Sequence, residues 1–97
     1  MPIKRLVGLN IVDNNMYQSY RDAMMPILKS YGGNFEYDFI ISKALKSKTN
    51  DLINRVFLIS FLDKDSMNLF FADKEYLKVK QKYFEKSVKH VTKIAIY

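Results

Sequence analysis

Apolar and polar positions alternate along four segments of the chain, which predicts four β-strands. These segments are residues 5–12, 34–44, 55–62 and 91–97. Residues two apart share one face of a strand, so each segment presents two rows of side chains. The third segment, RVFLISFL, is apolar in both rows, apart from its first residue and Ser60. This pattern indicates a strand that is covered on both faces.

A first helix is predicted between the first two strands, because apolar residues recur there every three or four positions. Polar residues 13–15 can cap its beginning. The pattern continues to about Tyr31, where Gly32 and Gly33 are expected to end the helix. Pro26 lies inside the pattern and is expected to kink the helix, because proline lacks an amide donor.

A second helical region is predicted in two pieces after the third strand. The first piece covers residues 66–72, and Asp73 can cap a longer piece that runs to about Lys89. The order of elements is therefore β-α-β-β-α-β. It predicts a single α+β domain over residues 1–97, with a ferredoxin-like four-stranded antiparallel sheet and both helices on one face. Right-handed crossovers place the first and third strands in the centre of the sheet.

The helices can cover only one face of this sheet. Alternation predicts the following residues under the helices: Val7, Leu9, Ile11, Phe35, Tyr37, Phe39, Ile41, Ile94 and Ile96. It assigns the following residues, with one row of the third strand, to the opposite face: Gly8, Asn10, Glu36, Asp38, Ile40, Lys93, Ala95 and Tyr97. This opposite face is about half apolar and half polar, and without a cover it would expose a contiguous patch to water. Such an exposed patch usually marks an interaction surface. We therefore predict a homodimer through the sheet face, which would bury roughly 800 Å² per chain.

Composition adds little chemistry but favours a location. The chain has no cysteine, which excludes disulfides and fits a reducing compartment. Residues 1–13 have no apolar run of signal-peptide length, and no segment approaches the length of a membrane span. These features predict a cytoplasmic protein that does not insert into membranes.

The net charge of +6 raises the question of an anionic partner. Lys74, Lys78, Lys82 and Lys86 recur every four residues and form one stripe on the predicted helix. Solvation explains such a stripe, and a phosphate-binding role would require a steep dependence on salt. The RNA-recognition module shares the predicted order of elements, but RVFLISFL matches two of seven positions of its third-strand motif. Single-stranded RNA binding is therefore the weaker alternative.

A ligand pocket is predicted in the cleft between sheet and helices. Asn10 interrupts an apolar strand, and a buried amide needs hydrogen-bond partners, so Asn10 is the leading candidate for a ligand contact. Tyr17, Tyr20, Tyr37 and Phe57 complete the candidate pocket. Apolar walls with a few polar groups are typical of sites for small apolar or aromatic molecules. Tyrosines at helical spacing also fit a plain core.

Other chemistry finds little support. His90 is the only histidine and has no partner evident in the sequence. Glu36 and Asp38 are two residues apart and are expected on one face, where they face solvent or pair across the dimer with Arg5, Arg55 or Lys93. Two carboxylates are too few oxygen ligands for a metal ion. The sequence predicts neither a metal site nor a cofactor.

Three segments carry a resemblance to a known family: DNNMYQSY at 13–20, MPILKSYGG at 25–33 and FADKEYLKVK at 71–80. They resemble a family of small bacterial proteins of unknown function (domain of unknown function, thirteen-thirty type) in the dimeric α/β-barrel superfamily. Antibiotic-biosynthesis monooxygenases are related to that family. Residues 40–42 replace a glycine pair that is usual there, and Tyr83 replaces a usual arginine.

The resemblance implies a homodimer whose two sheets close into a barrel. It also implies two alternatives for function. One is a cofactor-independent, monooxygenase-like enzyme that binds or oxidises a small apolar or aromatic molecule. The other is a non-enzymatic dimeric interaction module.

Overall fold

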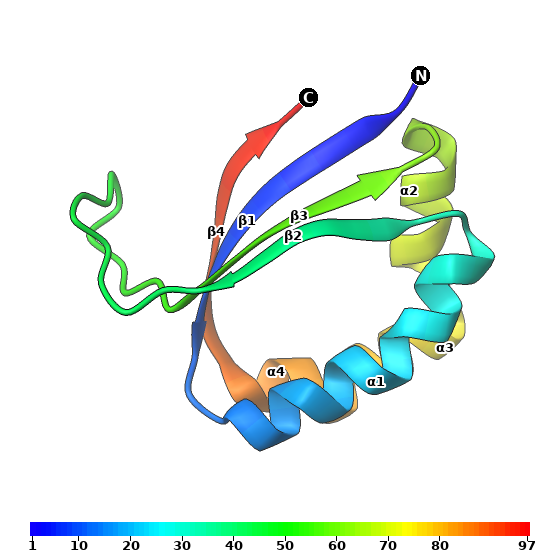
Figure 1. Cartoon of the computed structure of the whole chain (residues 1–97). Helices are drawn as coiled ribbons and strands as arrows, with labels where there is room; N and C mark the ends of the chain where they lie inside the picture. The colour runs from blue at the N-terminus through cyan, green and yellow to red at the C-terminus, as the bar shows by residue number, and fades with distance from the viewer.

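The computed structural model describes residues 1–97 and contains a four-stranded antiparallel sheet with strand order β2-β3-β1-β4. The strands are β1 (Ile3–Ile11), β2 (Asn34–Ile40), β3 (Arg55–Phe61) and β4 (Val88–Ile96). The helices are α1 (Asn14–Ser30), α2 (Lys64–Ala72), α3 (Lys74–Val79), the π-helix η1 (Lys80–Phe84) and α4 (Glu85–Ser87). All helices lie on one side of the sheet (Figure 1). The predicted ferredoxin-like order, with the first and third strands in the centre, is confirmed.

Short acidic side chains begin the three main helices. Asp13 Oδ1 accepts a hydrogen bond of 3.0 Å from the amide of Met16, and Asp63 and Asp73 cap α2 and α3 in the same way. Each cap satisfies an amide that the first helical turn leaves free. The prediction that the second helical region is split at Asp73 is confirmed.

Two predicted boundaries are wrong because pairing decides where strands begin and end. Strand β2 ends at Ile40, where it pairs with Arg55, the first residue of β3. Beyond it only the amide of Ile41 bonds across, to the carbonyl of Asn54, and residues 41–44 belong to the connecting loop. Strand β4 begins at Val88, opposite Ile11 of β1. The helical region consequently ends at Ser87, before the predicted Lys89.

The end of α1 depends on a glycine. Gly32 has a φ of +74°, and a Cβ built there would lie 2.5 Å from Cδ1 of Leu62. Both the left-handed backbone and the close approach favour glycine. Helix α1 continues through Pro26, which lies within the single helical span.

The helix-side face of the sheet carries the core. Val7, Leu9 and Ile11 point to the helices as predicted, and Phe57, Ile59 and Phe61 of β3 pair into the same face. This row of RVFLISFL is therefore the one that the chain covers itself. Leu28, Met24 and Phe70 pack over it and are almost fully buried. The other row, with Val56 and Leu58, belongs to the outer face.

A β-bulge in β2 overturns part of the predicted face assignment. Phe35 pairs with Ile59 and Tyr37 pairs with Leu58, so Glu36 is an extra residue in the ladder. Beyond this bulge the alternation is reversed. Asp38 faces the helices, whereas Tyr37 and Phe39 lie on the outer face, opposite to the prediction in all three cases.

Strand β4 contains a similar irregularity. Val7 pairs with Lys93 and Leu6 pairs with Ala95, which leaves Ile94 as the extra residue. Lys93 consequently lies on the helix side, although alternation predicted the outer face. Ile94 and Ile96 remain about half exposed and add nothing to the buried core.

The outer face remains apolar over part of its area. Tyr37 and Phe39 are 59% and 51% exposed, and their rings stack with centroids 5.9 Å apart. Ile53 from the loop after β2 covers Gly8, where an added Cβ would lie 3.0 Å from Ile53 Cγ2. No helix covers this face (Figure 1).

Asn54 fixes the loop between β2 and β3 to the sheet. Its side chain accepts a hydrogen bond from the amide of Ile11 and donates one to the carbonyl of Ile11, both 2.8 Å long. Its own amide donates to Leu9, and its carbonyl accepts from Ile41. Asn54 therefore continues the β-ladder beyond the first residue of β3.

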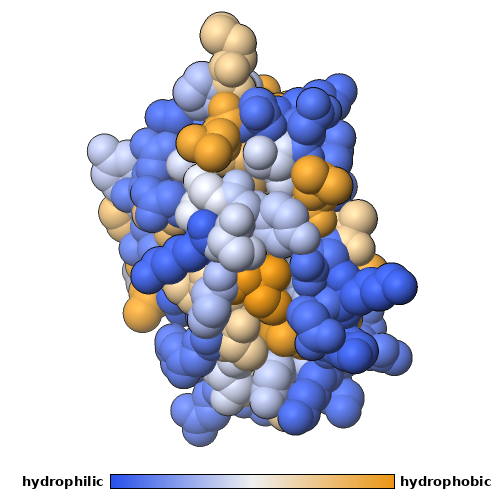
Figure 2. All heavy atoms as spheres, turned by 90° about the vertical axis from the view of Figure 1, so that its right-hand side faces the viewer, coloured by the Kyte–Doolittle hydropathy of each residue, from blue (hydrophilic) through white to orange (hydrophobic).

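The side of the molecule that includes α2 and α3 is mostly hydrophilic (Figure 2). Apolar atoms show there in small separate patches. The lysine stripe of residues 74, 78, 82 and 86 is exposed, which agrees with a solvated helix surface. None of the helices has the length and the apolar character needed to cross a bilayer.

Candidate functional site

A cavity of about 350 Å³, the apolar cavity, lies between the helix-side face of the sheet and the helices. Strands β1, β2, β3 and β4 contribute its floor, and helices α1, α2 and α3 with η1 contribute its roof. Thirteen of its sixteen lining residues are hydrophobic. Its size and walls are those of a site for a small apolar molecule.

The charged residues that line the apolar cavity are all cationic: Arg5, Lys80 and Lys93. The guanidinium of Arg5 lies 5.0 Å from the ring centre of Phe71, so an aromatic face positions it. Lys93 reaches the cavity because of the bulge at Ile94. Lys80 begins η1, and π-helical turns are frequent at functional sites. No carboxylate lines this cavity.

Three tyrosines, Tyr17, Tyr20 and Tyr76, line the apolar cavity. The hydroxyls of Tyr20 and Tyr76 form a buried hydrogen bond of 2.9 Å. Only one hydroxyl can donate in this pair, so the other keeps a proton to donate elsewhere. Burial raises the pKa of Tyr17 to about 12, against the lowering effect of Arg21 and Arg55. Burial and the Tyr76 hydroxyl raise the pKa of Tyr20 well above its usual value. These groups are protonated hydrogen-bond donors at neutral pH.

The structure divides the residues predicted to form the pocket. Tyr17, Tyr20 and Phe57 line the apolar cavity together. Tyr37 lies on the outer face because of the bulge at Glu36. Asn10 pairs with His90 on the outer face and lines a shallow hollow that the loop 42–54 forms.

His90 is tied to the same loop. Its Nε2 lies 2.9 Å from a carboxylate oxygen of Asp51. The pair connects β4 to the loop. Asn10 therefore belongs to a different region from the tyrosines with which it was grouped.

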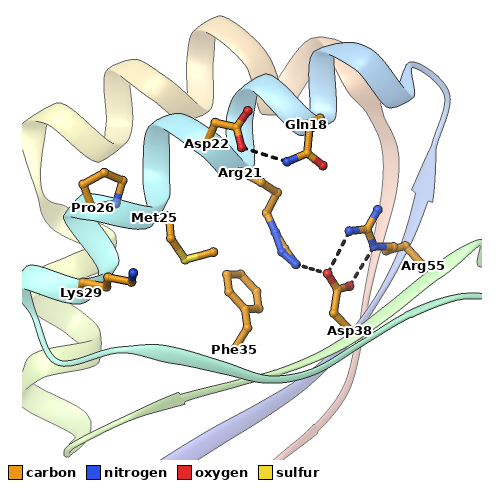
Figure 3. Close-up of a pocket in the computed structure, with 9 residues that line it drawn as sticks. All are labelled: Gln18, Arg21, Asp22, Met25, Pro26, Lys29, Phe35, Asp38 and Arg55. Carbon is orange, nitrogen blue, oxygen red and sulfur yellow. Dashed lines mark hydrogen bonds and ion pairs between the residues drawn. The ribbon is translucent and has the colours of Figure 1, made fainter.

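A second, open hollow of about 550 Å³, the polar pocket, lies between α1 and the β2 edge of the sheet (Figure 3). At one end of this pocket two arginines converge on Asp38 (Figure 3). Arg55 donates two hydrogen bonds of 2.8 Å to the two carboxylate oxygens, and Arg21 donates to one of them. Burial favours a higher pKa for Asp38, but the Arg55 hydrogen bonds and the charges of both arginines hold its pKa below the usual range.

Arg21 is the more buried of the two arginines, with 5% of its surface exposed. Its guanidinium lies over the ring of Phe35, 3.7 Å from the ring centre. Its Nη2 bonds to Asp38, whereas its buried Nε has no hydrogen-bond partner. Arg21 was not among the predicted site residues. Its position four residues after Tyr17, inside the apolar stripe of α1, is the signal that could have found it.

The two carboxylates of β2 do not form a pair. Glu36 bonds to Lys4 at 3.1 Å, whereas Asp38 faces the helices and bonds to Arg21 and Arg55. The expected pairing of Asp38 with Arg55 occurs within one chain. The predicted common face for the two carboxylates is wrong, because the bulge separates them.

Comparison with known proteins shows a shared fold. No family model and no curated protein matches the chain. Among solved structures it is similar to a dabb family protein with a ferredoxin-like fold from Mesorhizobium loti, with a TM-score of 0.71 and 13% identity over 99% of this chain and 94% of that one. It is also similar to a dimeric protein of unknown function with a ferredoxin-like fold from Bacteroides fragilis, with a TM-score of 0.61 and 12% identity over 99% and 94% of the two chains.

A third similar structure is SnoaB, a cofactor-independent oxygenase from Streptomyces nogalater. It matches with a TM-score of 0.64 and 10% identity over 99% of this chain and 90% of that one. Likeness at such low identity carries the fold and not the activity. The chain therefore has the ferredoxin-like fold named for the first two of these structures.

Proposed function

We propose that the apolar cavity binds a small apolar acid, such as an aromatic carboxylate or a phenolate. The observation that carries this proposal is the charge of its lining. Its walls are apolar, and its charged residues, Arg5, Lys80 and Lys93, are all cations. An uncharged ligand would leave these cations without a counter-charge, whereas an acid supplies one. The protonated tyrosines add hydrogen-bond donors for the same anionic group.

Ligand binding tests this proposal with two molecules of the same shape, 2-naphthoate and neutral 2-naphthamide. We expect naphthoate to bind about tenfold more tightly, because one charge-assisted hydrogen bond contributes on the order of 1.4 kcal/mol. Lys93→Gln should weaken naphthoate binding roughly threefold to fivefold, as for a partly exposed ion pair. It should leave naphthamide binding unchanged.

Lys78→Gln is the matched control, because Lys78 is exposed on α3 and does not line the cavity. Equal affinity for both molecules, or no binding of either, would contradict the proposal. An equal loss in both lysine variants would also contradict it, because it would assign the effect to overall charge.

Oxidative transformation of the bound molecule is the enzymatic form of this proposal. The cationic lining favours the anionic form of a phenol, which is the form that donates electrons to O₂ more readily. The fold of SnoaB supports this extension only by analogy. Consumption of O₂ with a bound naphthol tests it. Binding without consumption would favour a non-enzymatic binding module.

The proposal includes a cytoplasmic homodimer of the dimeric α/β-barrel type, closed through the outer face of the sheet. The exposed rings of Tyr37 and Phe39 support this arrangement, because they form an apolar patch that no helix covers. A neighbour described as dimeric has the same fold. Light scattering should give twice the chain mass at both low and high salt.

Phe39→Glu should convert this dimer to a monomer, whereas Leu69→Glu should not. Leu69 is 59% exposed on α2, on the helix side of the molecule, so it provides a matched control. A monomeric natural chain would contradict the dimer. The stacked rings of Tyr37 and Phe39 would then be free to stack on bases, and binding of oligouridylate would favour the RNA alternative.

A further inference from the structure

The polar pocket has more positive charge than the chain itself neutralises. Three cationic side chains line it, Arg21, Lys29 and Arg55, against two carboxylates, Asp22 and Asp38. Both arginines share the single carboxylate of Asp38. A partly buried site with a net positive charge attracts an anion of compact size.

The hydrogen-bonding capacity of Arg21 is also incompletely used. Its Nε is buried and has no partner, and Asp38 accepts only from Nη2. A buried donor without an acceptor is unfavourable, and structures usually satisfy such groups. Because this Nε has no accessible surface, a ligand oxygen in the pocket reaches it only after a shift of the Arg21 side chain.

The two guanidinium groups are held in place by aromatic rings. Arg21 lies over Phe35, and Arg55 lies 5.3 Å from the ring centre of Tyr17. They come from different elements, α1 and β3, so the fold fixes their relative position. A planar guanidinium fork matches the oxygens of a carboxylate or a phosphate. This pre-organisation reduces the entropy lost on binding.

The remaining lining limits what can bind. Lys29 offers a further ammonium group, and the Gln18 amide bonds to Asp22 at the opposite side of the opening (Figure 3). Met25, Pro26 and Phe35 are the only apolar residues among its nine lining residues. The pocket therefore suits a compact, strongly hydrated oxyanion better than a large apolar molecule.

We propose that the polar pocket is a second binding site, which takes a phosphate or carboxylate group of a small ligand on Arg21, Arg55 and Lys29. This site is separate from the apolar cavity. Phe35 is the one residue that lines both hollows, and neither arginine lines the apolar cavity. The inference therefore does not depend on the function proposed above.

Calorimetry with inorganic phosphate and with acetate tests the site, at constant ionic strength adjusted with chloride. We expect saturable binding of at least one of the two anions, and the preferred anion identifies the class of ligand. Arg55→Gln should weaken this binding about tenfold, as expected for the loss of a charge-assisted hydrogen bond. Lys64→Gln removes the same charge from a different hollow and should change the affinity less than twofold.

Asp38→Asn provides the sharper test, because it removes the competing carboxylate and keeps the shape of the side chain. Anion binding should become about tenfold tighter as both guanidinium groups become free. A merely structural role of the cluster predicts no such gain. If this variant does not fold, Arg55→Gln and Lys29→Gln decide the question, because both residues are more exposed than Arg21.

Three outcomes would overturn the second site: neither anion binds, Lys64→Gln weakens binding as much as Arg55→Gln, or Asp38→Asn weakens it. Naphthoate affinity separates this site from the apolar cavity. Arg55→Gln should leave naphthoate affinity within twofold of the natural chain, since Arg55 does not line that cavity. Failure at one site and success at the other are therefore distinguishable.

Discussion

The two faces of the sheet carry similar residues in different surroundings. On the helix side, Phe70 contacts both Phe61 and Tyr76, with Phe70 and Tyr76 ring centres 4.4 Å apart. On the outer face, Tyr37 and Phe39 also stack, but about half of each side chain is in water. Aromatic character therefore does not decide burial in this protein. The position of the helices decides it, and only the helix side has a core that the chain completes alone.

The largest effect should come from the covered face. Phe70→Ala removes a fully buried ring that contacts Phe61, Phe71 and Tyr76. We expect the free energy of unfolding to fall by about 3–5 kcal/mol, because the variant loses apolar burial and leaves a void. Urea denaturation measures this loss. A change below about 1 kcal/mol would mean that the core does not depend on this ring.

Asp38→Asn should have the next largest effect, because Asp38 joins β2 to both arginines. We expect a loss of about 1–3 kcal/mol at neutral pH, at the lower end because Asp38 is partly in water. Its folded-state pKa lies below the unfolded value near 4. The ionised Asp38 carboxylate therefore stabilises the fold at pH values above its unfolded-state pKa. This contribution is lost as the pH falls through its folded-state pKa.

The pH dependence of unfolding between about pH 5 and pH 2 checks the sign of this effect. The natural chain should lose stability more steeply than Asp38→Asn over this window. The variant should still show a slope, because the pKa values of Glu36, Asp63 and Asp73 are also lowered. Identical slopes would exclude a stabilising role for the ionised carboxylate.

Tyr20→Phe should have a smaller effect. It removes the hydrogen bond to the Tyr76 hydroxyl and leaves the ring packing intact. We expect a loss of about 0.5–1.5 kcal/mol in thermal or urea unfolding. Tyr76→Phe is the matched control and should cost a similar amount. A much larger loss in either variant would indicate that the hydroxyl groups form further stabilising interactions besides their mutual hydrogen bond.

The smallest effect should come from the outer face. Phe39→Ala should change the stability of the isolated chain by less than about 0.5 kcal/mol, because the ring is half exposed. If the outer face is a dimer interface, the loss should grow with protein concentration, since association stabilises the folded state. Unfolding at micromolar and at submillimolar chain concentrations separates the two cases. A loss above 1 kcal/mol that does not depend on concentration would contradict both the small effect expected for the isolated chain and the dimer interface.

Hydrophobic periodicity was sufficient to predict the order of the elements and the core row Val7, Leu9 and Ile11, and short polar residues were sufficient to predict the helix caps. It was not sufficient to place Asp38, Tyr37 and Phe39 on the correct faces. Period-two reasoning assumes an unbroken ladder, and one extra residue at Glu36 reverses every position that follows. The strand Asn34–Ile40 itself contains no glycine or proline that would mark the bulge.

The candidate site was predicted in part for the same reason. Tyr17, Tyr20 and Phe57 were predictable because their faces follow from a regular helix and a regular strand. Lys93 reached the apolar cavity through a bulge, and Asp38 reached the arginines through another. The helical spacing of Arg21 places it on the apolar face of α1, so its burial could have been predicted. It was missed because a charged side chain is ordinarily expected to face solvent. Pairing between strands, which fixes these positions, is not contained in the local pattern.

Asn54 has a practical consequence for how the chain could be altered. The side chain of Asn54 forms hydrogen bonds to Ile11, and its main-chain carbonyl accepts one from Ile41. These bonds fix the end of the sheet, so strand pairing does not depend on the loop that follows Ile41. The residues between Ile41 and Asn54 are then a permissive place for inserted sequence, since doubling the length of a loop costs only about 0.6 kcal/mol. A tag or a reporter peptide introduced beside Thr49 would leave the four strands in register, provided that Asn54 is retained.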